Sequence, residues 1–155
     1  TFGALLHMLV HSITKSAIFF AAGTASQMNS TQEMSGIRGL VKGNPLVGWG
    51  LMLGTVAIAG VPPFGVFTSE FLILTAAMKD APYLAPVFLL GLAIAFAALF
   101  RKVMPMVFGD PAPYQVSIKA SSVPVIAHLV IMLILGLYMP VFLNDWFHKA
   151  VELLR

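Results

Sequence analysis

Two histidines and a lysine recur at every fourth position near the start of the chain: His7, His11 and Lys15. On a helix, a step of four residues rises about 6 Å and turns about 40° beyond a full turn, so the three would form one stripe about 12 Å long. Histidine exchanges protons near neutral pH, and a lysine removed from water releases its proton more readily. Such a column suits stepwise proton transfer. The alternative is that the histidines only hydrogen-bond to neighbouring helices and that Lys15 extends its ammonium group to water.

Glycine and proline interrupt the second apolar segment at residues 60–65, which read GVPPFG. Pro62 and Pro63 lack amide hydrogens, and a proline also disfavours the helical conformation of the residue before it. Gly60 and Gly65 add conformational freedom on either side. We therefore predict that the backbone departs from helix between about Val61 and Phe67.

A single carboxylate, Glu70, follows this interruption within an apolar run. Thr68 or Ser69 would be suited to cap the helix that resumes here. We expect Glu70 to exchange protons beside the broken backbone, where water has access. The alternative is that Glu70 only neutralises a buried lysine.

Three further charged or titratable residues are secondary candidates. Arg101 and Lys102 are expected to mark one end of the third apolar segment, or else to extend the charged axis. His128 stands alone in the fourth segment, where a histidine is more often a packing residue. His7 and His11 have the spacing of zinc ligands, but no glutamate lies between them and no third ligand is evident. The chain has no cysteine. We therefore expect no metal site and no cofactor in this chain.

The composition is that of a membrane protein. Of the 155 residues, 59% are hydrophobic and 10% are charged, with a mean hydropathy of +0.92. A soluble domain carries about 25% charged residues, and one membrane-spanning helix needs about 20 apolar residues. The net charge of +3 is small and the basic residues lie in connections or at segment ends, which argues against nucleic-acid binding.

The pattern predicts an all-α, polytopic transmembrane helix bundle with four spans, at about 2–22, 45–78, 83–108 and 123–143, and an amphipathic tail at 144–155. The second span could be one broken helix or two short helices joined by a hairpin. A broken helix places the basic connections 24–44 and 101–121 on the same side, as the positive-inside rule favours, so we prefer it. Broken backbone at membrane depth must be buried in protein or line a wet cavity.

Apolar sequence begins at Thr1 without an initiator methionine or a leader pattern. We therefore expect residues 1–155 to be the C-terminal part of one larger membrane domain.

A family resemblance follows from four motifs in order. They are residues 7–20 (HMLVHSITKSAIFF), 37–40 (IRGL), 59–64 (AGVPPF) and 67–71 (FTSEF). In this order they resemble antiporter-like subunits of respiratory complex I, Mrp-type sodium/proton antiporters and membrane-bound nickel-iron hydrogenases. Many members place a lysine at or beside the position of Glu70, and this chain lacks it. The chain resembles component F of hydrogenase-4 and subunit M of complex I more than the L type of complex I subunit. The run from Gly36 to Leu74 favours component F.

The resemblance implies a proton-translocating, multi-pass subunit of a prokaryotic inner membrane, without a redox centre of its own. Its partners would be other membrane subunits and a hydrophilic hydrogenase or dehydrogenase arm. The segment broken at Pro62-Pro63 would match the family's discontinuous helix. Under this hypothesis, His7, His11 and Lys15 relay protons and Glu70 exchanges them on the exit side. Two alternatives remain: a cation/proton antiporter subunit that also uses sodium, and a structural membrane module whose charges only fix packing.

Overall fold

The computed structural model describes residues 1–111, 116 and 121–153, and these residues form helices and connections without a β-strand. The all-α class is therefore confirmed. The elements are α1 (Phe2–Asn29), η1 (Met34–Gly36), α2 (Leu40–Gly43), α3 (Pro45–Ile58), α4 (Gly65–Asp80), η2 (Pro82–Leu84), α5 (Ala85–Phe108), α6 (Val123–Leu137) and α7 (Val141–Leu153).

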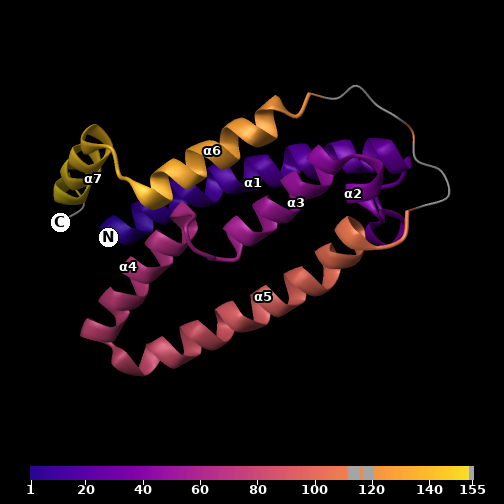
Figure 1. Cartoon of the computed structure of the whole chain (residues 1–155). Helices are drawn as coiled ribbons and strands as arrows, with labels where there is room; N and C mark the ends of the chain where they lie inside the picture. Colours follow the sequence, from indigo (N-terminus) through magenta and orange to yellow (C-terminus); the bar gives the residue numbers. More distant parts are fainter. Residues whose placement is uncertain (112–115, 117–120, 154–155) are drawn as a thin grey trace.

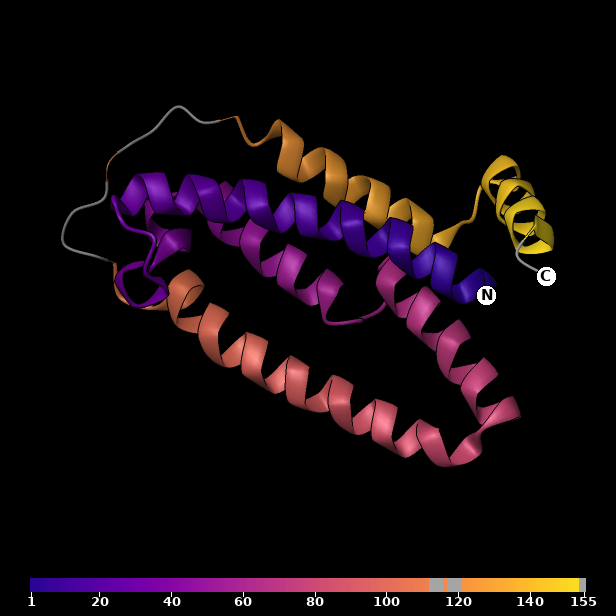
Figure 2. The ribbon, with the colours of Figure 1, turned by 180° about the vertical axis from the view of Figure 1, so that it is seen from behind.

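The long helices run back and forth between two ends of the molecule (Figure 1). Helix α1 leads from the N-terminal end to the end that carries α2. Helices α3 and α4 return, α5 crosses again, and α6 returns once more. Because α4 continues away from α2 where α3 stops, the two form one broken crossing and not a hairpin, and the reverse view agrees (Figure 2). The preference for a broken second segment is therefore confirmed.

The break lies two to three residues earlier than predicted: α3 ends at Ile58 and α4 begins at Gly65, so residues 59–64 depart from helix and Phe67 already belongs to α4. Gly60 has φ of +68°, a left-handed conformation in which glycine has no steric penalty. The expected cap from Thr68 or Ser69 is wrong. Phe64 occupies the N-cap position without a side-chain hydrogen bond, and both polar residues lie inside α4, beyond its N-cap.

Helix α1 packs through one face, which carries Leu6, Val10, Thr14, Ala17, Ala21, Ala25 and Met28. The alternation of four-residue and three-residue steps keeps these positions on one side of the helix. Ala17, Ala21 and Ala25 have no exposed surface. Their small side chains let α1 lie closely against α3 and α6, and the same buried cluster includes Leu40 of α2 and Val103, Met106 and Val107 of α5.

Two segment ends differ from the expected ones. Helix α1 continues to Asn29 and not only to residue 22, because its polar residues bond within the helix. Thr24 donates to the carbonyl of Phe20 at 3.0 Å, and Asn29 donates to that of Ala25 at 2.8 Å. The fourth segment stops at Leu137 and not at residue 143, because Pro140 disfavours helix in the residue before it.

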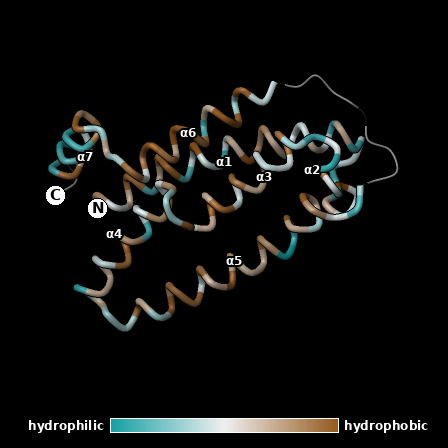
Figure 3. Tube along the Cα trace, viewed as in Figure 1, coloured by the Kyte–Doolittle hydropathy of each residue, from teal (hydrophilic) through white to brown (hydrophobic). Residues whose placement is uncertain are grey.

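By length and composition, two helical stretches among the described residues can each cross a membrane: Phe2–Asn29 and Pro82–Phe108. The pair α6 and α7 adds a third if its 75° bend is counted within one span. Helix α3, with 14 residues, is too short to cross alone, and α4 continues its direction toward the other end of the molecule (Figure 1). Polar residues gather near α2 and along α7, as Figure 3 shows. Helix α7 buries Phe147 and exposes Trp146, so the amphipathic tail begins at Val141.

The break is held by α6 through a glycine contact. A Cβ atom on Gly136 would overlap the carbonyl oxygen of Pro63 and lie 2.6 Å from the carbonyl carbon of Phe64. Thr68 also donates a hydrogen bond to the carbonyl of Gly136, at 3.4 Å. Glycine at this place therefore lets α6 press directly on the irregular backbone.

The substitution Gly136→Ala should force α6 away from the break and destabilise the fold by about 1–3 kcal/mol, the usual cost of overpacking. Thermal unfolding of the purified membrane protein would measure the loss. Gly91→Ala is a matched control, because a Cβ atom on Gly91 meets nothing within 4 Å. Equal melting temperatures for the two variants would contradict the proposed contact.

Candidate functional site

A cavity of about 390 Å³ brings His7, His11 and Glu70 together. Helix α1 supplies the two histidines, and α4 supplies the carboxylate. Ile58 at the end of α3 and Ala59 at the start of the break also line the cavity, and the rest of the wall is apolar side chains of α5, Leu92, Ala95, Phe96 and Leu99. Three titratable side chains from two helices therefore share one otherwise apolar cavity beside the broken backbone.

The tautomer of His7 follows from its hydrogen bonds. Its Nδ1 lies 3.0 Å from the hydroxyl oxygen of Ser69, and that hydroxyl donates to the carbonyl of Val66 at 2.8 Å. A serine hydroxyl has one hydrogen, so Ser69 must accept from His7, and Nδ1 carries the proton. In the neutral ring Nε2 is then an acceptor. The ring of His11 is the neighbour of His7 along α1, and the centroids of the two rings are 5.3 Å apart.

Glu70 is half-buried and its carboxylate lies over the backbone of Gly60. A Cβ atom at Gly60 would overlap Oε2 of Glu70, so the glycine opens the space that the carboxylate occupies. Glu70 also lines a second cavity of about 410 Å³ between α4 and α5, where Phe67, Phe71 and Phe88 dominate. The carboxylate therefore stands between two cavities.

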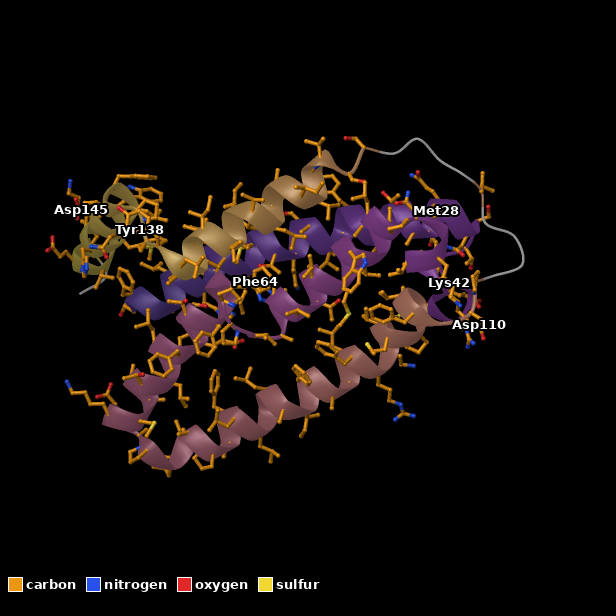
Figure 4. The ribbon with its side chains drawn as sticks, in the orientation of Figure 1. Met28, Lys42, Phe64, Asp110, Tyr138 and Asp145 are labelled. Carbon is orange, nitrogen blue, oxygen red and sulfur yellow. The ribbon has the colours of Figure 1, made fainter. Side chains whose placement is uncertain are left out.

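Among the described residues, the salt bridge found joins Lys42 to Asp110 at 3.4 Å, and Glu70 has no basic partner within ion-pair distance. The alternative in which Glu70 neutralises a buried lysine thus finds no support in this part of the chain. Figure 4 places Lys42 and Asp110 at the α2 end of the molecule, whereas Phe64, at the end of the break, lies at its middle.

Lys15 lies outside the cavity and its side chain is exposed. The reason is the drift of the stripe around α1. Each four-residue step turns about 40° past a full turn, so Lys15 stands about 80° around the axis from His7. The buried face of α1 corrects this drift with three-residue steps, and the histidine stripe does not. The structure thus groups His7, His11 and Glu70, and leaves Lys15 about 6 Å along the helix from His11.

The secondary candidates lie elsewhere. The ring of His128 bonds through Nδ1 to the carbonyl of Pro124 at 2.6 Å and packs on Phe20, which is the packing role expected of a lone histidine. Arg101 and Lys102 are exposed near the end of α5. They line a separate cavity with Arg38, and this cavity does not contain His7, His11 or Glu70.

Sequence reasoning assigned Ser69 only to capping and Gly60 only to the break. Ser69 fixes the orientation of His7, and Gly60 makes room for Glu70. The adjacency of Ser69 and Glu70 in the sequence was the available signal, but the partner on α1 could not be read from it. Within the described residues, no group of three or more His, Cys, Asp or Glu side chains is placed to hold a metal ion.

Comparison with known proteins agrees with this architecture. The NADH:quinone oxidoreductase/Mrp antiporter transmembrane family matches residues 1–100. A hydrogenase-4 component F homolog of Methylacidiphilum infernorum is 42% identical over 99% of this chain and 32% of its own length. A putative antiporter subunit, mnhD2, of Staphylococcus aureus is 30% identical over 92% of this chain and 30% of its own length.

The chain thus spans about a third of the length of these relatives. Its apolar helices and the extent of the family match both indicate an integral membrane protein. The ordered motifs, the helix broken between Ile58 and Gly65, and the match over residues 1–100 lead to one conclusion: the chain belongs to the NADH:quinone oxidoreductase/Mrp antiporter family of transmembrane subunits.

Proposed function

We propose that this chain translocates protons as a membrane subunit of a redox-driven complex, with His7, His11, Lys15 and Glu70 as its proton-carrying residues. The observation that carries the proposal is the cavity of about 390 Å³ that His7, His11 and Glu70 share. Ionisable groups within spanning segments are costly, and they mark ion pathways when they face a common interior.

The route ends at the broken helix, on the exit side. The ammonium of Lys15 gives a proton through water to His11, one helical turn away along α1, and the imidazolium of His11 passes a proton through water to Nε2 of His7. The resulting imidazolium of His7 keeps its Nδ1 proton on Ser69 and gives the Nε2 proton through water to the carboxylate of Glu70. Glu70 then releases the proton to water on the exit side. Each step moves one proton from a named donor to a named acceptor. Once the next proton enters, every residue of the route has returned to its starting protonation state.

The relatives favour a complex of the hydrogenase-4 type, because the hydrogenase-4 component F homolog shares more identity with this chain than the putative antiporter subunit does. The partners would then be further membrane subunits and a hydrophilic nickel-iron hydrogenase or dehydrogenase arm, and the chain itself would need no cofactor. The second candidate is a cation/proton antiporter subunit, which the match to mnhD2 supports. Proton flux measured with and without sodium separates the two, since only an antiporter requires the second cation.

Glu70→Gln tests the proton-carrying role. Glutamine keeps the size of the side chain but has no exchangeable acid proton, so proton translocation should fall about tenfold or more while the complex still assembles. Redox turnover and proton pumping are to be measured separately in the purified complex. Pumping at the normal rate would remove Glu70 from the route. Failure of assembly would favour the structural alternative, in which the carboxylate only supports packing.

Gly60→Ala tests the position of the carboxylate without changing any ionisable group. The new methyl group would occupy the place of Oε2 and strain a backbone with φ of +68°, so Glu70 must move. We expect pumping to fall by about the same factor as in Glu70→Gln. Gly23→Ala is the control, because a Cβ atom there meets nothing within 4 Å. Full pumping in Gly60→Ala would show that the contact with Gly60 is irrelevant.

Lys15→Ala tests whether protons reach the cavity along α1. Lys15 is exposed, so its removal should leave folding unchanged within about 0.5 kcal/mol. Proton translocation should still drop by about tenfold or more. The same purified complex serves for both measurements. Retained translocation would mean that protons reach His11 by another path.

A further inference from the structure

Three cations surround a small cavity where α5 meets the connection after α1. Arg38, Arg101 and Lys102 line it together with Met34, Ser35 and Pro105, and its volume is about 210 Å³. No carboxylate is among these six residues. Asp110, the acidic residue of the same end, pairs instead with Lys42 at 3.4 Å. The cavity therefore concentrates positive charge, and its volume is large enough for a phosphate group with its substituents.

The geometry of the three cations suits an anion with several oxygen atoms. Arg101 and Lys102 are consecutive on α5, and Pro105 follows one turn after Arg101 on the same face. Arg38 comes from the opposite wall, where its Nε donates to the carbonyl of Ser35 at 3.2 Å and so fixes the plane of the guanidinium. Guanidinium groups bind phosphate oxygens in a forked arrangement, and lysine adds a movable point charge.

The depth of the cavity matches the headgroup level of a bilayer. From Pro82 to Phe100 the chain has nineteen residues without a charge, which as helix span about 28 Å. That length is close to the thickness of a hydrocarbon core, about 30 Å. Tyr83, which is 74% exposed, marks the other boundary with an aromatic ring suited to the interface. Arg101 and Lys102 therefore lie at the depth of the lipid phosphates.

The remaining lining points to a lipid and not to a free ion. Met34 is an apolar side chain, 47% exposed, at the rim of a cationic cavity. On the face of α5 that carries Arg101, the preceding turns expose Ile94 and Leu90. A free phosphate ion makes no apolar contacts with these surfaces, whereas the glycerol and acyl chains of a lipid would cover them. Basic pockets between membrane helices are suited to anionic headgroups.

We propose that Arg38, Arg101 and Lys102 form a binding site for the phosphodiester of an anionic membrane lipid, with its acyl chains along the exposed face of α5. The site is independent of the proton route, because it contains none of its residues. It anchors the end of α5 to the connection that holds Arg38.

The test uses the intact complex in phosphatidylcholine liposomes that contain a trace of photoactivatable phosphatidylglycerol. Cross-links are mapped to the peptides of η1 and the end of α5, and a photoactivatable phosphatidylcholine serves as the neutral probe. We expect phosphatidylglycerol to label these peptides at least about fivefold more than phosphatidylcholine. Arg101→Gln and Lys102→Gln should each lower that labelling about fivefold, the effect of one cation near the surface. Both side chains are exposed and glutamine suits a helix, so the fold is retained.

Two controls make the result specific. Lys79→Gln removes an exposed cation from the end of α4, at the other end of the molecule, and should leave the labelling unchanged. Lys102→Arg keeps the charge and should restore it. Equal labelling by both lipids, or the same loss in Lys79→Gln, would overturn the proposal. An excess of inorganic phosphate should not displace the lipid probe. If it does, and radiolabelled phosphate is retained by the wild type but not by Arg101→Gln, the site is one for free phosphate and the lipid proposal fails.

Discussion

The structure depends on one constraint: where a helix is interrupted within an apolar bundle, its backbone amides must still find hydrogen-bond acceptors. The described hydrogen bonds answer this residue by residue. The amide of Ala59 bonds to the carbonyl of Thr55 at 3.0 Å, that of Gly60 to Ala57 at 3.3 Å, and that of Val61 to Val56 at 3.3 Å.

Pro62 and Pro63 have no amide hydrogen to satisfy, and the amide of Phe64 bonds back to Val61 at 3.3 Å. Glycine and proline therefore end α3 without leaving a donor unpaired. The last carbonyls of a helix have no partner within it. At this break Ala59 lines both cavities beside Glu70 and Gly60 lines one of them, so water can reach them there. The interruption that the fold must accommodate thus creates the polar space in which a carboxylate can lie.

The sequence predicted those parts of the fold that single residues decide. Two successive prolines between glycines were enough to predict that the helix stops, and the distribution of basic residues favoured a broken crossing over a hairpin. The ends of α1 and α6 were not predicted. Thr24 and Asn29 are as compatible with a loop as with a helix, and only their bonds to carbonyls one turn back show which they adopt. Pro140 itself indicated that the helix of the fourth segment should stop before it. The apolar run of residues 123–143 was nevertheless taken as one span.

For the site, periodicity found the residues but not their grouping. A stripe at every fourth position turns steadily around its helix, and a neighbouring helix can meet only part of it. His7 and His11 therefore face Glu70 while Lys15 faces outward, although all three were placed on one stripe. The bond between His7 and Ser69 joins residues 62 positions apart. Its existence depends on how α1 packs on α4, which no local pattern encodes.

Helix α5 connects the proton-carrying cavity with the cationic end. Leu92, Phe96 and Leu99 form one wall of the cavity that His7, His11 and Glu70 share, and Arg101 follows two residues after Leu99. Most of α5 is exposed in this chain, and few of its side chains hold it against α1 or α4. Its position is therefore set largely at its two ends, by the short turn after α4 and by the buried side chains of Val103, Met106 and Val107, which pack in one cluster with α3. A phosphodiester bound between Arg38 and Arg101 would fix the second end, and with it the wall that keeps the cavity closed to lipid on that side. A rigid wall matters for a relay, because the water that carries a proton between Glu70 and His7 must stay within hydrogen-bond reach of both.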